Sequence, residues 1–219
     1  FETGKLSTAE QLRTRLHTWL EEQFEAGGDE LVIKDPRLAW FLGLWRSAAL
    51  RAGASCSHVT MLRPVTEVVG SKQKYYAKRF GEVNRVAAWV NMMLHTERST
   101  RGSLRAYVRY ADLLDDWTVP LHEIGERFDL YALRAASAKE IRQVHHFIDP
   151  TLRRVQLTWD DVPVPARLRE IGIPLAAAIV VSTGCASLFL VPALGYGIFT
   201  NPTAVGQYLL SVTGACGLV

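Results

Sequence analysis

Two positively charged residues each follow a short apolar run near the start of the chain. Lys34 comes directly after Leu31-Val32-Ile33, and Arg63 comes directly after Val59-Thr60-Met61-Leu62. Both runs have the length and composition of buried strands. In an open α/β sheet, ligands bind in the crevice beyond the carboxyl ends of parallel strands. The two cations therefore predict an anionic ligand at this edge of the sheet.

Arg63 and Ser71 lie at the expected end of a strand and in the first turns of the helix that follows it. A guanidinium binds phosphate through paired, charge-assisted hydrogen bonds, and a serine near the start of the following helix adds a donor where the helix dipole also favours an anion. The structural alternative is an ion pair of Arg63 with Glu67, with Ser71 merely tolerated in the helix. Lys74 lies further along the same helix. Its side chain either contacts the phosphate or lies on a solvent-exposed face of the helix.

The composition limits the classes of protein to which this chain can belong. The chain has 219 residues, of which 48% are hydrophobic and 21% are charged, so it can bury the core of one domain, with or without an appendage. Its net charge of +3, without a long basic run, gives no argument for nucleic acid. Cys56, Cys185 and Cys216 are an odd number without Cys-x-x-Cys spacing, which argues against a disulfide framework or a zinc site and favours a reducing, cytoplasmic compartment.

Strand patterns alternate with helix patterns along the first 147 residues. A Ser7 to Glu10 capping box and Gly27-Gly28 bound the first expected helix, and Asp35-Pro36 is a good start for the second. Strands alternating with helices of this length predict an α/β fold with a parallel sheet. The further expected elements are helices from 64 to 80, 83 to 97, 118 to 128 and 133 to 147, and a strand from 104 to 110.

The composition changes after Glu170. Residues 171–219 contain no Asp, Glu, Lys or Arg, and 175–191 is an uncharged run close to the lower length limit of a membrane span, about 17 residues. Arg167 and Arg169 would suit its cytoplasmic flank. The alternative is an end that does not belong to the fold. We therefore divide the chain into an α/β domain, residues 1–170, and an uncharged tail, residues 171–219, which is a candidate membrane segment.

Four segments occur in the order found in one enzyme family. They are LVIKDPR at residues 31–37, LRPVTEVVGS at 62–71, WVNMMLHTERSTR at 89–101 and YVRYADLL at 107–114. Together they resemble the bacterial branch of the sulfotransferases that use 3′-phosphoadenosine 5′-phosphosulfate. The resemblance covers about residues 31–128. It implies a three-layer α/β sandwich with a parallel sheet, similar to the P-loop NTPases.

The resemblance also implies a role for each candidate residue. Lys34 corresponds to the family's catalytic lysine, whose ammonium stabilises charge on the leaving phosphate. Arg63 and Ser71 correspond to the element that binds the 3′-phosphate, and Tyr110 to the tyrosine on the adenosine side. The expected acceptor is a hydroxyl or amine on a small molecule or glycan, and no metal is expected. Ordinary packing is the alternative for Tyr110, and a solvated strand end is the alternative for Lys34.

One family element is missing from the sequence. The glycine-rich loop for the 5′-phosphosulfate should precede Leu31, but Gly4-Lys5-Leu6-Ser7 does not fit it, because Leu6 stands where Ser or Thr should follow the lysine. We expect that this loop and the first strand preceded Phe1, so the chain would be an N-terminally truncated fragment. Two other functions stay open: a P-loop-type small-molecule kinase, and a non-catalytic remnant that binds a membrane or a partner.

Overall fold

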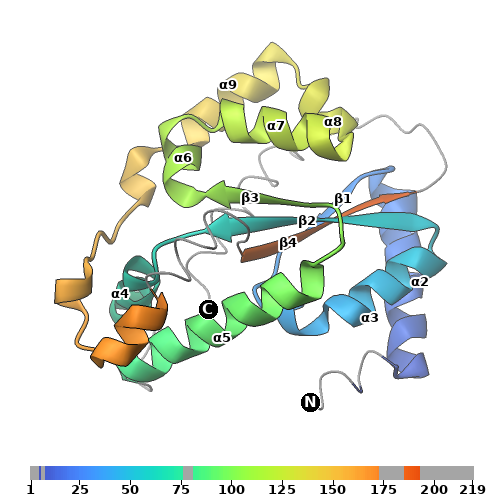
Figure 1. Cartoon of the computed structure of the whole chain (residues 1–219). Coiled ribbons are helices and arrows are strands. Elements are labelled where there is room, and N and C mark those ends of the chain that lie inside the picture. The colour runs from blue at the N-terminus through green and yellow to red at the C-terminus, as the bar shows by residue number, and fades with distance from the viewer. Residues whose placement is uncertain (1–4, 6–7, 76–80, 173–184, 193–219) are drawn as a thin grey trace.

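The computed structural model of the chain has a mixed α/β fold and describes residues 5, 8–75, 81–172 and 185–192 (Figure 1). Within these residues, four strands form one sheet in the order β1-β4-β2-β3. Their bounds are Leu31–Ile33 for β1, Ala54–Leu62 for β2, Arg105–Arg109 for β3 and Cys185–Pro192 for β4.

The sheet is mixed, although its first three strands all point the same way. β2 and β3 are parallel neighbours, whereas β4 runs antiparallel to both β1 and β2. It follows that β1 points in the direction of β2, so β1, β2 and β3 end at the same edge of the sheet. The predicted parallel sheet is therefore present in part: β2 and β3 are parallel neighbours, and the antiparallel β4 lies between β1 and β2.

β4 comes from the uncharged tail and pairs with strands of the α/β domain. Leu190 lies between Leu31 of β1 and Cys56 of β2. The predicted boundary between residues 170 and 171 is therefore not a boundary of the sheet. The rest of the uncharged tail after Gly172 falls outside the described residues. Within the part of the chain that the structure describes, no helix combines the length and apolarity that crossing a membrane requires.

Helices lie on both faces of the sheet (Figure 1). α2, α3, α4 and α5 pack on one face, and α6, α7 and α9 pack on the other. Two short 3-10 turns, η1 and η2, and a helical segment at residues 166–172 complete the described chain. The helix bounds are Glu10–Gly27 for α2, Leu38–Arg51 for α3, Val65–Tyr75 for α4, Glu82–Thr100 for α5, Tyr110–Asp115 for α6, Thr118–Phe128 for α7, Tyr131–Arg134 for α8 and Ala138–Phe147 for α9; η1 is Pro150–Leu152 and η2 is Trp159–Asp161.

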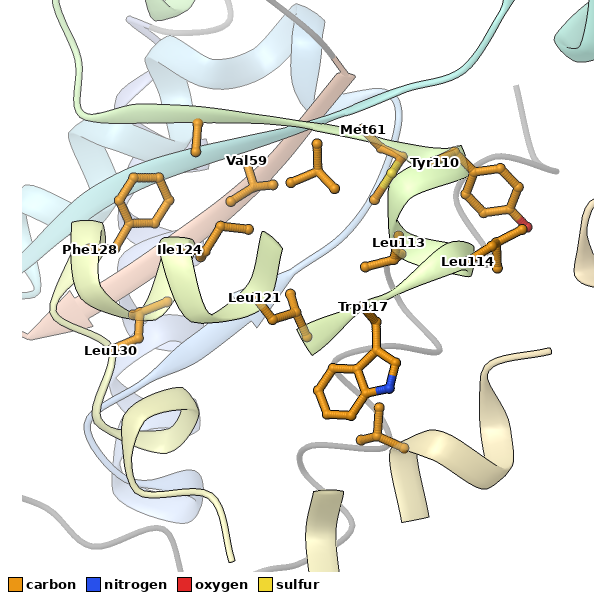
Figure 2. Packing of buried hydrophobic residues seen from close by; sticks show 13 residues of the cluster. Val59, Met61, Tyr110, Leu113, Leu114, Trp117, Leu121, Ile124, Phe128 and Leu130 are labelled. Atoms are coloured by element: carbon orange, nitrogen blue, oxygen red, sulfur yellow. The ribbon is translucent and has the colours of Figure 1, made fainter. Parts of the chain in front are cut away.

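The side chains of β2 alternate between two hydrophobic cores. Val59 and Met61 point toward α6 and α7, where they pack with Leu113, Leu121 and other apolar side chains (Figure 2). Leu62 points to the opposite face and joins the core formed with α3, α4 and α5. Because successive strand residues point to opposite faces, this one strand anchors helices on both sides of the sheet.

Two of the predicted helix boundaries were wrong. α2 begins after Ala9, which makes no side-chain cap, rather than after a capping Ser7, and Ser7 is outside the described residues. The helix expected from 133 to 147 is two helices, α8 and α9, with a break at Ser137. Ser137 accepts a hydrogen bond from the Glu140 amide while Glu140 caps the Ser137 amide, and this reciprocal pair starts a new helix.

His58 on β2 is fully buried against the α3 and α5 face. Neither ring nitrogen has a hydrogen-bond partner among the described residues, and neither does Oγ1 of the neighbouring Thr60. Burial, with Arg46 and Arg105 nearby, lowers the pKa of His58 to about 4. The imidazole is therefore neutral in the folded protein at neutral pH.

We predict that His58 makes the folded state sensitive to acid. Between pH 6.5 and 4 the unfolded chain binds a proton at His58 that the folded chain does not, so stability falls as the pH falls. This should cost about 2–3 kcal/mol between pH 7 and 4.5. Urea unfolding at several pH values should show a shallower pH dependence for His58→Phe than for the wild type. Thr60→Val, which removes a buried polar atom that does not titrate, should keep the wild-type slope, and equal slopes for His58→Phe and wild type would contradict the prediction.

Candidate anion-binding site

Arg63 and Tyr110 lie side by side at the carboxyl ends of two adjacent strands. Leu62 of β2 pairs with Arg109 of β3, so Arg63 and Tyr110, the residues that follow them, lie next to each other. The Arg63 guanidinium carbon lies over the Tyr110 ring, 5.1 Å from its centroid, and both residues are buried. The Tyr110 hydroxyl donates to the Leu152 carbonyl at 3.2 Å. The fold therefore brings together two of the predicted cofactor-binding residues.

A buried carboxylate joins Arg63 to a second arginine. Glu67, with 2% of its side chain exposed, accepts from Arg63 Nε at 3.2 Å and from Arg153 Nε at 2.9 Å. The hydrogen bond to Glu67 holds the pKa of Arg153 above its ordinary value. The sequence alternative of an Arg63–Glu67 ion pair is thus present in the structure. Arg153 differs from Arg63 in that 35% of its side chain is exposed, so the cluster reaches solvent on the Arg153 side.

The chain around Arg153 packs directly on α4. Thr66 of α4 donates its hydroxyl to the Leu157 carbonyl at 2.7 Å. A Cβ at Gly70 would lie 2.3 Å from Leu157 Cδ1, so only glycine allows this approach without displacing the side chain. Ser71 is buried on the same side of α4 as Glu67, one helical turn further on. Residues 150–157 and the first two turns of α4 therefore form one packed unit around Glu67.

Lys34 lies at the same edge of the sheet but not beside Arg63. Across β4, Ile33 is level with His58, because both pair with Leu188. β2 continues for four more residues after His58, so Lys34 lies about 13 Å short of Arg63 along the strand direction. Any ligand that touches both cations must therefore extend along this edge.

The turn after Lys34 is organised by Asp35. Asp35 accepts from the Arg37 amide at 2.8 Å and from Arg37 Nε at 2.9 Å, and α3 begins only at Leu38. The Arg37 hydrogen bonds, with a smaller contribution from Lys34, keep the pKa of Asp35 below its ordinary value. Asp35 thus caps a turn rather than the helix itself, and Arg37 is its ion-pair partner.

The remaining candidates add little to the cluster. Lys74 belongs to α4, but its side chain is outside the described residues. Among the side chains that the structure describes, no group of three His, Cys, Asp or Glu is placed to hold a metal ion. A pocket of about 530 Å³ lies between α7, α8 and α9, and Lys34, Arg63, Ser71 and Tyr110 do not line it.

Arg153 is the site residue that sequence reasoning missed. It follows Glu67 by 86 residues, and it lies in an irregular stretch without a motif. The only signal in the sequence was Glu67 itself, whose carboxylate can accept hydrogen bonds from a second donor besides Arg63. Two guanidinium groups and a serine at the carboxyl edge of parallel strands form an arrangement that suits an anion with several oxygens.

We predict that Glu67 is essential to the stability of this region. Glu67→Gln removes the charge that two guanidinium groups share in a buried setting, which should lower the free energy of unfolding by about 3 kcal/mol. Urea unfolding measures this directly. Glu10 is a matched control, because it also bridges two arginines, Arg13 and Arg51, but on the surface. Glu10→Gln should have a much smaller effect, and equal effects of the two substitutions would contradict the assigned role of Glu67.

Comparison with protein-family models, with curated proteins and with solved structures found no match for this chain. The resemblance to the sulfotransferases thus rests on the four sequence segments alone and stays a prediction. What the fold provides independently is the arrangement of Arg63, Tyr110, Glu67 and Arg153 at one edge of the sheet.

Proposed function

We propose that this chain is a sulfotransferase, of the three-layer P-loop-like type, that binds the 3′-phosphate of 3′-phosphoadenosine 5′-phosphosulfate at the Arg63 cluster. The observation that carries the proposal is the meeting of Arg63, Tyr110 and Arg153 at the edge where three codirectional strands end. This is the edge at which α/β folds bind nucleotides. The proposed acceptor is a hydroxyl or amine of a small molecule or glycan in the cytoplasm.

Glu67 has a positioning role in this proposal. Its carboxylate is held by Arg63 from the sheet side and by Arg153 from the segment after η1. A guanidinium has five N–H donors, so Arg153 can hold Glu67 through Nε and one terminal nitrogen and still present its other terminal nitrogen to a phosphate. The nucleotide would therefore reach the cluster from the Arg153 side, with Ser71 behind it on α4.

Lys34 has the catalytic role in this proposal. In the transfer, the bond between sulfur and the 5′-phosphate oxygen breaks and a bond between sulfur and the acceptor oxygen or nitrogen forms, while the acceptor loses a proton. Negative charge collects on the leaving phosphate, and an ammonium placed there stabilises it. The backbones of Lys34 and Arg63 lie apart along the edge of the sheet, so in this proposal both side chains extend toward a nucleotide that lies between them.

Binding of adenosine 3′,5′-bisphosphate tests the phosphate site. Calorimetry should give an affinity at least about tenfold higher than for 5′-AMP, because only the bisphosphate carries the 3′-phosphate. Arg63→Gln and Arg153→Gln should each remove most of this difference.

Arg109 supplies the matched control for that experiment. It lies at the same edge, at the end of β3, but its side chain is exposed and pairs with Asp112. Arg109→Gln should keep the preference for the bisphosphate. Equal affinity of the wild type for both nucleotides, or loss of the preference only in Arg109→Gln, would rule out the proposed site.

A transfer assay tests Lys34 without knowledge of the acceptor. In the reverse direction, adenosine 3′,5′-bisphosphate takes the sulfuryl group from 4-nitrophenyl sulfate and releases coloured 4-nitrophenolate. Lys34→Gln should lower this rate by about two orders of magnitude while leaving the affinity for the bisphosphate within about twofold. An unchanged rate in Lys34→Gln would show that Lys34 is not the catalytic cation.

A further inference from the structure

A pocket separate from the Arg63 cluster lies on the outer helical layer. It has a volume of about 530 Å³ and is lined by residues of α7, by the end of α8 and by Ile141 of α9. This volume is in the range of small-molecule sites. No residue assigned to the proposed sulfotransferase reaction lines it, so it calls for an explanation of its own.

Contacts at two places fix the helices around this pocket. Near the start of α7, Trp117 Nε1 donates to His145 Nδ1 of α9 at 3.2 Å. Near the end of α7, a Cβ at Gly125 would be only 3.0 Å from the Leu133 Cβ, so α8 lies close against α7 there. The buried Glu30 also accepts from the Tyr131 and Ala132 amides of α8. α8 and α9 are thus each pinned to the rest of the fold, and the space between them does not close.

The pocket has an apolar floor and partly exposed apolar walls. Trp117 and Leu121 belong to the buried core under α7 and form the floor. Val119 and Ile141 stand at the walls with 55% and 36% of their surface exposed. Large apolar side chains gathered around a concave surface are characteristic of a binding site, whereas single exposed apolar side chains are ordinary.

One cation lies on the lining of the pocket. Arg134 bonds Asp129 Oδ1 through a single terminal nitrogen at 2.7 Å, and Asp129 is 82% exposed in its side chain. Such an exposed ion pair contributes little free energy to the fold, so a ligand carboxylate can displace Asp129 from Arg134. The guanidinium fork matches a carboxylate in geometry and charge. The other polar residues of the lining are Thr118, His122 and the acidic Glu123, all on α7, so the carboxylate has to lie on the Arg134 side of the pocket, away from Glu123.

We propose that this pocket binds an amphipathic small molecule with an apolar body and a carboxylate group. The apolar body occupies the space between Trp117, Leu121 and Ile141, and the carboxylate pairs with Arg134. The pocket is held open by α8 and α9 and does not depend on the nucleotide. This site is independent of the proposed sulfotransferase reaction.

Calorimetric titration of the full chain with decanoate tests the proposal. One saturable site is expected, and decanamide, which lacks the charge, should bind about tenfold more weakly. Ile141→Trp, which fills the pocket, should weaken decanoate binding at least about tenfold, and Val119→Trp is a second filling variant at a position that tolerates a larger side chain. Thermal unfolding of each variant confirms that it is folded.

Two control variants separate the pocket from the general surface. Ile171→Trp adds the same ring at an exposed position outside the pocket and should bind decanoate as the wild type does. Arg134→Gln should remove the preference for decanoate over decanamide, whereas Arg142→Gln, on the exposed side of α9, should keep it. Absence of saturable binding, or wild-type affinity in both filling variants, would overturn the site. An unchanged preference in Arg134→Gln would overturn the assignment of the carboxylate.

Discussion

The buried carboxylate of Glu67 is the interaction on which the rest of the candidate site depends. It holds Arg63, at the end of β2, and Arg153, which lies 86 residues later in a stretch without regular structure. Removal of one partner from a buried ion pair costs far more than the pair contributes, because the remaining charge has no solvent. Glu67 therefore holds the irregular segment around Arg153 against α4. It also holds Arg63 in position over the ring of Tyr110. The cations stay in place because this one anion binds both.

The sheet places this cluster and Lys34 on the same edge but at different heights. β1 and β2 do not pair with each other, since β4 lies between them and runs in the opposite direction. Lys34 is therefore separated from Arg63 both across the sheet and along it. A ligand that contacts both cations has to lie between them, with the Lys34 and Arg63 side chains extending toward it from separate strands.

The sequence was sufficient to predict the helices and strands that have strong local signals. The sequence predicted the apolar runs of β1 and β2, the helices α3, α5 and α7, and the general α/β class. These predictions came from periodicity and from helix-boundary residues such as Pro36. The antiparallel β4 could not be predicted, because an uncharged run of this length has no periodicity that distinguishes a strand from a buried helix. The break at Ser137 had a local signal, the capping box with Glu140, but the apolar spacing through Ile141 and Val144 concealed it. The contact of Arg153 with Glu67 depends on tertiary folding alone.

A crystal structure of the full chain with adenosine 3′,5′-bisphosphate would show directly whether the Arg63 cluster binds the nucleotide. We expect the 3′-phosphate within hydrogen-bond distance, about 3 Å, of the guanidinium groups of Arg63 or Arg153, with the Glu67 carboxylate still in contact with both arginines. The 5′-phosphate should extend along the sheet edge toward Lys34. A nucleotide bound elsewhere, with the Arg63 cluster unchanged and unoccupied in the same crystal, would contradict this expectation.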